Sequence, residues 1–500
     1  MTTLVELRNI HLEKLSKLRS LGTDPYPAKS FRTNLNAEIH KDFEKFEGKE
    51  VVVAGRIVSI REHGKLAFVD LKDASGKVQL YIKEENLQSP DHKNSELGFS
   101  ELNLLDVSDF AEGKGTVVKT QRGEISIEVK SLRLLTKSLR QLPDQWEGLK
   151  DKETRLRKRY IDTNINEEVY QRFIRRAKFW EAHREFLNKK GFLEMNVPVL
   201  ETTPGGADAN PFVTHMDVLD QDFYLRISQE LYLKRLIGGG YEKVYEIGPR
   251  FRNEGMSDEH LPEHIAIEFY WAYADWKQGR DLIIELFRYV ANKVYGTGKF
   301  KARGFEFDLD KEWETLDYVD ILKKRFGINI FDTDLKTATE ALKKEGATID
   351  KKINLNRAID DLWKIARKEI NGPAMVIHEP KFLSPLAKSD HENPKLALRF
   401  HPIIAGSELG NGFSELNDPV DQFERFKEQQ EMRNKGDKEA QFMDIDFVEM
   451  LEYGMPPTLG WGHSERVFWF LEDVPAKEGV PFPQLKHEID ETAKKIYGLK

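Results

Sequence analysis

The segment from residue 245 to residue 275 carries side chains suited to binding an oxyanion. Arg250 and Arg252 stand close to Glu254, and Glu268 follows after a short polar stretch. A guanidinium group matches two oxygens of a phosphate or a carboxylate at once. The apolar runs on either side of the polar stretch predict two strands joined by a loop, with these groups on a shared face. An anion site and an ordinary salt-bridge ladder across a sheet both fit this pattern.

Other motifs for nucleotide or metal binding are missing or do not fit. The chain has no G-x4-G-K-[ST] sequence and no G-x-G-x-x-G after a strand, so a nucleotide would not bind through either of those glycine-rich loops. His260 and His264 belong to an H-x-x-E-H sequence, which some peptidases use to bind zinc on a helix. Pro262 lies between them and opposes a helix. We therefore interpret this sequence as unrelated to zinc.

Composition indicates a globular protein of several domains. The 500 residues include 77 Lys and Arg against 85 Asp and Glu, a net charge of −8, and 39% are hydrophobic. The acidic balance argues against a protein that coats DNA. No apolar run approaches the roughly 18 residues of a membrane helix, and the absence of cysteine excludes disulfides and thiolate metal sites. We therefore expect a cytoplasmic protein with no membrane and no DNA partner.

The first 145 residues predict a helix followed by a small β-barrel. Leucines recur every three or four positions over residues 3–22, as in an amphipathic helix. Short alternating runs with glycine-containing turns then predict about five strands. The window from Lys114 to Arg140 holds seven basic residues and two glutamates, so we expect a basic side on the barrel. A solvated strand face and a platform for single-stranded nucleic acid both remain open.

The remainder predicts helices and strands in an irregular order. Residues 144–162 are strongly charged and predict a linker that leads into a helix, and the lysine-rich residues 333–369 predict a helical insertion. The lack of a regular alternation favours a mainly antiparallel sheet over a doubly wound one. The expected helices are residues 166–190, 229–239, 276–295, 315–325 and 420–436, and the expected strands are residues 222–228, 242–252, 264–274, 374–378, 399–406 and 467–472.

Several long segments resemble the signatures of class II aminoacyl-tRNA synthetases, and two of them resemble the lysine-specific members in particular. The similarity extends from about residue 5 to residue 490, in order and at the family's spacing. The third signature is one residue short and has glutamate, Glu465, where aspartate is usual. The signature-like segments are Gly191–Pro198 with Pro204–Ala207, Phe251–Glu254 and Gly454–Arg466, and the lysine-specific ones are Tyr224–Arg235 and Asn411–Asp418.

This resemblance implies an α+β protein. An OB-fold barrel that binds the anticodon would occupy residues 1–145, and a catalytic domain on an antiparallel sheet flanked by helices would occupy residues 146–500. The resemblance further implies that lysine is activated with ATP and Mg2+, that lysine is transferred to the 3′ end of tRNA(Lys), and that the chain forms a homodimer. An aspartate or asparagine enzyme of the same architecture and a non-catalytic tRNA-binding relative remain as alternatives.

The resemblance also implies roles for single residues. Arg252 and Arg466 would be the catalytic cations, and Glu408 would bind Mg2+, with His401 standing where a second metal carboxylate is usual. Glutamates gathered in one pocket would repel one another unless a cation joined them, which favours a cationic substrate. The expected ATP-binding residues are Arg252, Glu254, His264, Glu408 and Arg466; the expected lysine-binding residues are Gly206, Glu230, Arg252, Glu268, Tyr270, Asn411, Phe413 and Glu415; and the expected anticodon-binding residues are Arg61, Phe68, Gln79 and Glu124.

Overall fold

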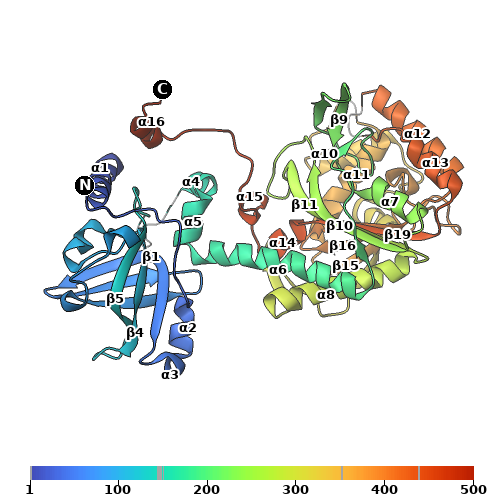
Figure 1. Ribbon diagram of the computed structural model, residues 1–500. Coiled ribbons are helices and arrows are strands. Elements are labelled where there is room, and N and C mark those ends of the chain that lie inside the picture. The colour runs from blue at the N-terminus through green and yellow to red at the C-terminus, as the bar shows by residue number, and fades with distance from the viewer. Residues whose placement is uncertain (1–2, 144–148, 150, 351–352, 437–439, 500) are drawn as a thin grey trace. The chain divides into compact units, whose positions relative to one another are not determined.

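The chain divides into two compact units, which we describe separately (Figure 1). The computed structural model describes residues 3–143, 149, 151–350, 353–436 and 440–499. The first unit comprises residues 1–155, 160–165 and 485–500, and the second comprises residues 156–159 and 166–484. Part of the expected linker, residues 144–148 and 150, lies outside the described residues.

The first unit is built around a closed five-stranded barrel, as the alternating runs predicted. Buried aliphatic side chains at every second position of the strands fill its interior. The runs on either side of Gly55 form one continuous strand, because a glycine there lets the backbone pass close to Lys72. The strands, in barrel order, are β1 (Glu50–His63), β2 (Leu66–Lys72), β3 (Lys77–Lys83), β5 (Ile125–Thr136) and β4 (Phe110–Lys119).

Short helices accompany this barrel. The expected N-terminal helix is α1 (Leu4–Ser20), and Thr3 begins it with a capping box that includes Glu6. The other helices of this part of the chain are α2 (Asn36–Lys41), α3 (Phe43–Phe46), η1 (Glu84–Asn86), η2 (His92–Asn94), η3 (Phe99–Leu104), α4 (Lys152–Arg157), α5 (Arg159–Ile165) and α16 (Glu491–Tyr497).

The second unit is built on one large sheet, which is antiparallel except for its outermost pairs. This agrees with the expected antiparallel sheet. At its centre, β19 pairs with β11, although these two strands come from segments far apart in the chain. The sheet order is β14 (Glu314–Asp317), β15 (Ala374–Ile377), β16 (Arg399–Ile404), β18 (Asn411–Ser414), β19 (Thr458–Ser464), β11 (Glu263–Ala272), β10 (Lys243–Phe251) and β6 (Leu193–Glu194), with β17 (Ser407–Glu408) beside β16.

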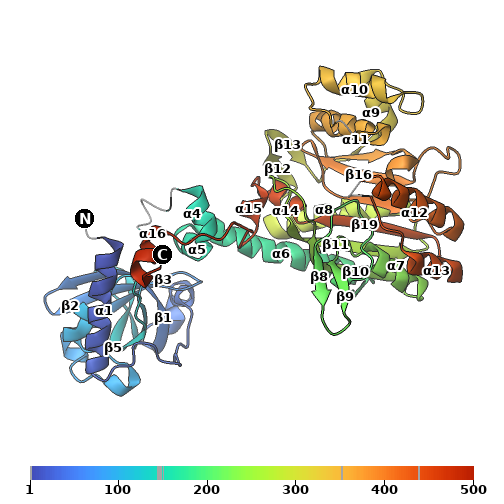
Figure 2. The same ribbon diagram turned by 90° about the horizontal axis from the view of Figure 1, so that it is seen from above.

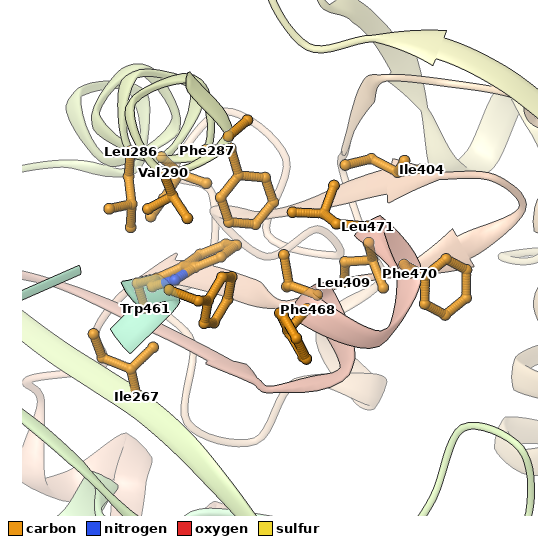
Figure 3. Close-up of a cluster of buried hydrophobic side chains, with 14 of the residues drawn as sticks. Ile267, Leu286, Phe287, Val290, Ile404, Leu409, Trp461, Phe468, Phe470 and Leu471 are labelled. Carbon is orange, nitrogen blue, oxygen red and sulfur yellow. The ribbon is translucent and has the colours of Figure 1, made fainter. Parts of the chain in front are cut away.

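Alternation along the central strands separates an apolar face from a polar one. Phe269 of β11 and Trp461 of β19 point into the main hydrophobic core, where Trp461 packs against Phe287 (Figure 3). Glu268 and Tyr270, which precede and follow Phe269 on β11, therefore face the other side of the sheet. The helices that contribute to the main core are α6 (Glu167–Lys189), α8 (Trp276–Tyr295) and α14 (Arg466–Leu471), and those beside the polar face are α7 (Glu230–Gly238), α12 (Pro419–Asn434) and α13 (Ile445–Tyr453).

The expected insertion is helical, and Figure 2 shows it gathered on one side of the second unit. Its helices α10 (Leu335–Lys344) and α11 (Leu355–Ala366) pack together with α9 (Tyr318–Phe326) in a separate hydrophobic cluster. The remaining short elements are β7 (Leu200–Glu201), β8 (Val213–Met216), β9 (Gln221–Leu225), β12 (Lys299–Ala302), β13 (Phe305–Asp308), η4 (Arg367–Glu369), η5 (Lys381–Leu383) and α15 (Ala476–Gly479).

One expected strand is wrong. Residues 467–472 were predicted to be a strand, yet residues 466–471 form helix α14. Every side chain from Val467 to Leu471 is buried, so the run is apolar on all sides and its periodicity does not distinguish a helix from a strand. The sequence also gave no sign of the strands β18 and β19. No described helix is long and apolar enough to cross a membrane.

Candidate functional site

The polar face of the sheet lines a cavity of about 260 Å³. Tyr270 lies opposite Gly460 on the neighbouring strand, and Gly460 lies opposite Phe413 on the next, so the strand register brings these side chains together. All of the residues expected around lysine line this one cavity: Gly206, Glu230, Arg252, Glu268, Tyr270, Asn411, Phe413 and Glu415.

The three expected glutamates in this cavity are almost fully buried, with exposures of 6% for Glu230, 4% for Glu268 and 1% for Glu415. Glu268 is already satisfied, because it accepts hydrogen bonds from Arg250 (2.5 Å), Ser228 (2.5 Å) and Tyr270 (3.1 Å). Burial raises the pKa of Tyr270 well above its usual value, so its hydroxyl keeps its proton and donates.

Glu230 and Glu415 share a cation of the chain itself. The ammonium of Lys234 lies 2.5 Å from Glu230 Oε1 and also pairs with Glu415 Oε2. Glu415 Oε1 is buried and has no hydrogen-bond partner among the described residues. Burial, only partly opposed by Lys234, raises the pKa of Glu415 well above its usual value. A cation bound in the cavity would offset this burial cost, so the site favours a positively charged ligand.

Two glycines leave the space that this arrangement needs. Gly206 has a φ of +82°, which favours glycine, and a Cβ atom there would lie 2.7 Å from Cβ of Glu230. A Cβ atom on Gly460 would overlap Glu415 Oε1. Both positions therefore require glycine if the two carboxylates are to line the cavity.

A second cavity, of about 150 Å³, adjoins the first. The two share four lining residues, and Arg252 is one of them. The Nε atoms of Arg252 and Arg466 are buried and lack a hydrogen-bond partner among the residues that the structure describes. Because Arg252 lines both cavities and Arg466 lines the second, these donors suit an anion that spans the two. Arg252, Glu254, His264 and Arg466, all expected around ATP, line the second cavity, and the shared residues are Arg250, Arg252, Asn411 and Gly462.

Electrostatics in the second cavity favour an anion over a metal ion. Burial and the nearby Arg250 lower the pKa of Arg252 to about 10, so the guanidinium remains charged at neutral pH. Burial and Arg252 lower the pKa of His264 to about 3, so its ring is neutral there. Glu254 is exposed at the mouth and accepts from the backbone N–H of Asn210 at 3.4 Å. The neutral ring of His264 can contact a nucleobase, while the guanidinium groups of Arg250 and Arg252 beside it can bind phosphates.

Glu408, the fifth residue expected around ATP, lines a third cavity of about 230 Å³. His401 stands between two carboxylates there: its Nδ1 lies 3.0 Å from Glu408 Oε1, and its Nε2 pairs with Glu379. Although burial opposes it, Glu408 and Glu379 raise the pKa of His401 to about 9. Sequence reasoning missed Glu379, which no local pattern connects with residue 401.

The chemistry of Glu408 and His401 decides whether Mg2+ fits here. This ion prefers oxygen ligands and commonly takes one or two carboxylates with phosphates and water. Both nitrogens of His401 are engaged with carboxylates, so His401 does not offer a ligand. Within the described ranges, no group of three or more His, Asp or Glu side chains could hold a metal ion alone. The other oxygen of Glu408, Oε2, accepts a long hydrogen bond from the indole N–H of Trp363 at 3.5 Å. The donor set therefore fits one Mg2+ shared between Glu408 and ligand phosphates.

The residues expected to read an anticodon lie on one outer face of the barrel. Arg61 pairs with Phe68 across β1 and β2, while Gln79 of β3 lies opposite Ser126 of β5, two residues after Glu124. The strand register thus brings all four onto a continuous surface. Sequence reasoning missed Tyr81, which lies opposite Phe68 and stacks on it with ring centroids 5.3 Å apart.

The expected basic side of the barrel is not a continuous surface. Lys137 is fully buried between Asp106 and Asp109, and Arg133 is buried against Glu112. Lys114 and Lys130 both pair with Glu50. The excess of positive charge counted in residues 114–140 is thus largely neutralised by carboxylates outside that window. A local charge count does not include these partners.

Comparison with known proteins agrees with this geometry. Residues 151–486 match the family described as tRNA synthetases class II (D, K and N). The chain belongs to the class II tRNA synthetases. Residues 51–135 of this synthetase also match the OB-fold nucleic acid binding domain, which confirms the expected fold.

Full-length relatives of the synthetase carry a more specific name. A Thermotoga maritima protein named Lysine--tRNA ligase is 43% identical over 97% of this chain and 96% of its own length. Proteins of the same name from Thermoanaerobacter pseudethanolicus and Moorella thermoacetica are 44% and 43% identical, over 97% and 96% of this chain and 97% and 98% of their own lengths. The resemblance inferred from the signatures is confirmed.

Two peculiarities of this synthetase have a structural explanation. Glu465 in the third signature is buried, pairs with Arg176 at 2.6 Å and accepts from the backbone N–H of Ile265 at 3.0 Å. It therefore anchors the end of β19 directly before Arg466, which lines the second cavity and pairs there with Glu259 at 3.8 Å. His264 lies on β11 and His260 in the loop before it, so the two imidazoles do not share a helical face.

Proposed function

We propose that this synthetase is a lysine--tRNA ligase, which activates lysine with ATP and transfers it to the 3′ end of tRNA(Lys). The observation that carries this proposal is the cavity lined by Glu230, Glu268 and Glu415, in which Glu415 Oε1 is buried without a hydrogen-bond partner among the residues that the structure describes. A cationic donor such as an ammonium group would satisfy this oxygen and offset the buried charge. The name shared by the full-length relatives supports the same substrate.

Lysine would lie along this cavity with an ammonium group at each end. Glu230 would bind the α-ammonium, and Glu415 with Glu268 would bind the ε-ammonium, with the hydroxyl of Tyr270 beside it. The side chains of Asn411 and Phe413 would form the wall along the methylene groups, and Gly206 would leave room for the backbone of the substrate. Norleucine, which lacks the ε-ammonium, would leave Glu415 unpaired.

Arg252 would act where the two substrates meet, because it lines both cavities. A carboxylate oxygen of lysine attacks the α-phosphorus of ATP, the bond to the β-phosphate breaks, and pyrophosphate leaves. Arg252 binds the α-carboxylate and the α-phosphate as negative charge shifts between them. Arg466 binds the γ-phosphate, Glu254 reads the adenine, and the neutral ring of His264 lies against it. In the second step a ribose hydroxyl of tRNA attacks the acyl carbon, and AMP leaves.

Glu408 would hold Mg2+ together with the phosphates of ATP. When bound, this ion neutralises charge on the phosphate oxygens and on the leaving pyrophosphate. The remaining assignments concern partners: the barrel face with Arg61, Phe68, Gln79 and Glu124 would bind the anticodon of tRNA(Lys), and the first signature would mediate a homodimer. Single-stranded RNA is recognised by such stacked rings and edge-bonding groups.

An aspartate or asparagine enzyme is the competing assignment, because the family includes synthetases for both amino acids. Besides Arg252, two cations contact the glutamates of this pocket: Arg250, which lines the cavity, and Lys234, which does not line it. Arg250 pairs with Glu268, and Lys234 pairs with Glu230 and Glu415. Neither cation is available for a substrate carboxylate, so the pocket favours lysine.

Amino-acid-dependent exchange of pyrophosphate into ATP, measured over the twenty amino acids, tests the proposal. Exchange with lysine alone is the expected result. Exchange with aspartate or asparagine would assign the competing activity, and no exchange with any amino acid would indicate a non-catalytic tRNA-binding relative. Charging of a tRNA(Lys) transcript, and not of a tRNA(Asp) transcript, then tests the transfer step.

A further inference from the structure

A fully buried lysine behind the substrate cavity has no role in the steps above. Lys234 has an exposure of 0% and lies one turn after Glu230 on α7. It does not line the cavity, although both of its carboxylate partners do. Its ammonium also lies 5.4 Å from the ring of Phe413 and 5.8 Å from that of Phe447. A buried charge so fully enclosed is costly unless its partners hold it in place.

The contacts of Lys234 determine which carboxylate oxygens remain for a ligand. Lys234 engages Oε1 of Glu230 and Oε2 of Glu415, which fixes the orientation of both groups. Oε1 of Glu415 then occupies the space that Gly460 leaves open, where it has no partner among the described residues. Without the ammonium, two buried carboxylates would face each other with nothing to separate them.

Lys234 also offsets part of the charge of these carboxylates. The three glutamates are contacted by two buried cations, Lys234 and Arg250. Arg250 lines the cavity and Lys234 does not, so Lys234 leaves the cavity side of Glu230 and Glu415 open to a cationic ligand.

We propose that Lys234 is a positioning residue for substrate selection, which holds Glu230 and Glu415 from behind and turns Glu415 Oε1 toward an ammonium group of the ligand. This inference rests on the proposed function for the identity of the ligand. The role assigned to Lys234 itself rests on charge and geometry, so the two can fail separately.

Lys234→Ala in the full chain tests the proposal by chemical rescue. The substitution removes the atoms from Cγ to the ammonium, which propylammonium reproduces, whereas propanol has a similar shape without the charge. In pyrophosphate exchange, we expect the KM for lysine to rise about 30-fold or more, because a buried charge pair is broken. Added propylammonium should lower that KM toward the wild-type value, and propanol should not. For the wild-type chain, propylammonium should leave the KM unchanged or raise it by competition.

Lys137→Ala is the matched control, because Lys137 is also fully buried between two carboxylates but lies in the barrel. Its KM for lysine should match the wild-type value with or without the amine. A wild-type KM in Lys234→Ala would overturn the proposal, and so would equal rescue by propanol, since that would show a packing effect.

Two further measurements keep the inference separate from folding and from the proposed function. Lys234→Gln retains a hydrogen-bond donor and most of the length, so it tests the charge alone if the alanine variant does not fold; a wild-type lysine KM in this variant would refute the role. Thermal unfolding tests the site without a substrate: propylammonium should raise the Tm of Lys234→Ala by more than that of the wild type, in which the side chain of Lys234 already occupies that position. If the wild-type chain showed no lysine-dependent exchange while this Tm shift occurred, the function would be wrong and the carboxylate-positioning role would stand.

Discussion

Glu415→Gln is the most direct test of the substrate pocket. This substitution keeps the shape of the side chain, at a position that is 1% exposed, and removes the carboxylate that a bound ammonium group would hold in its ionised form. Lys234 retains Glu230 as a partner, so the variant should fold. The oxygen that has no partner within the described part of the chain, Glu415 Oε1, is the one that the variant replaces or neutralises.

The expected size of the effect follows from the burial of this pair. Losing the charged partner of a buried ion commonly costs about 2 to 5 kcal/mol, which corresponds to about 30-fold to a few thousand-fold in affinity. The KM for lysine in pyrophosphate exchange should rise by at least the lower figure. The KM for ATP should change little, because Glu415 does not line the second cavity. Discrimination between lysine and norleucine should fall in parallel.

Glu201→Gln provides the matched control. Glu201 is also buried, at 3% exposure, but burial raises its pKa to about 9, so the side chain is neutral at pH 7.5. Replacing a neutral carboxyl group with an amide away from the cavity should leave the KM for lysine unchanged. The reasoning would be refuted by a wild-type lysine KM in Glu415→Gln, or by unchanged discrimination against norleucine.

Three other predictions concern separate parts of the molecule. Arg252→Lys should fold normally but lose most pyrophosphate exchange, because an ammonium cannot make the two-pronged contact of a guanidinium; near wild-type exchange would make Arg252 a structural residue. Phe68→Ala in the full chain should weaken binding of a lysine-anticodon stem-loop by about 1 to 3 kcal/mol in a salt-controlled titration, and equal wild-type binding to a loop with cytidine at the central position would contradict the anticodon assignment. Burial lowers the pKa of His183 to about 4, so this residue takes up a proton at a higher pH in the unfolded chain than in the folded one. Its contribution to the free energy of unfolding is therefore complete above pH 6.5 and falls by up to about 3 kcal/mol as the pH decreases toward 4. The free energy of unfolding should therefore fall less steeply between pH 6.5 and 5 in His183→Gln than in the wild type, and parallel pH curves would show that His183 is not responsible.

The sequence alone was enough to predict features that depend on near neighbours. Alternating runs in residues 49–135 predicted the barrel, because a strand with one buried face repeats every second residue. The helices α1, α6 and α8 lie within the ranges predicted as helical, residues 3–22, 166–190 and 276–295. Long signature segments carried the family resemblance. All eight residues that this resemblance assigned to lysine binding line one cavity.

Only the tertiary structure decided how charges far apart in the chain neutralise one another. Lys234 pairs with Glu415, and His401 pairs with Glu379, through tertiary contacts that no local sequence pattern predicts. The apolar run of α14 could be a strand or a helix until its surroundings buried it on all sides. The basic window of the barrel lost its surface charge in the same way, because its partners lie outside the window. Residue types and spacing determined which groups could do chemistry. Long-range packing decided which of them stay available to a ligand, because most buried charged groups are paired with other groups of the protein.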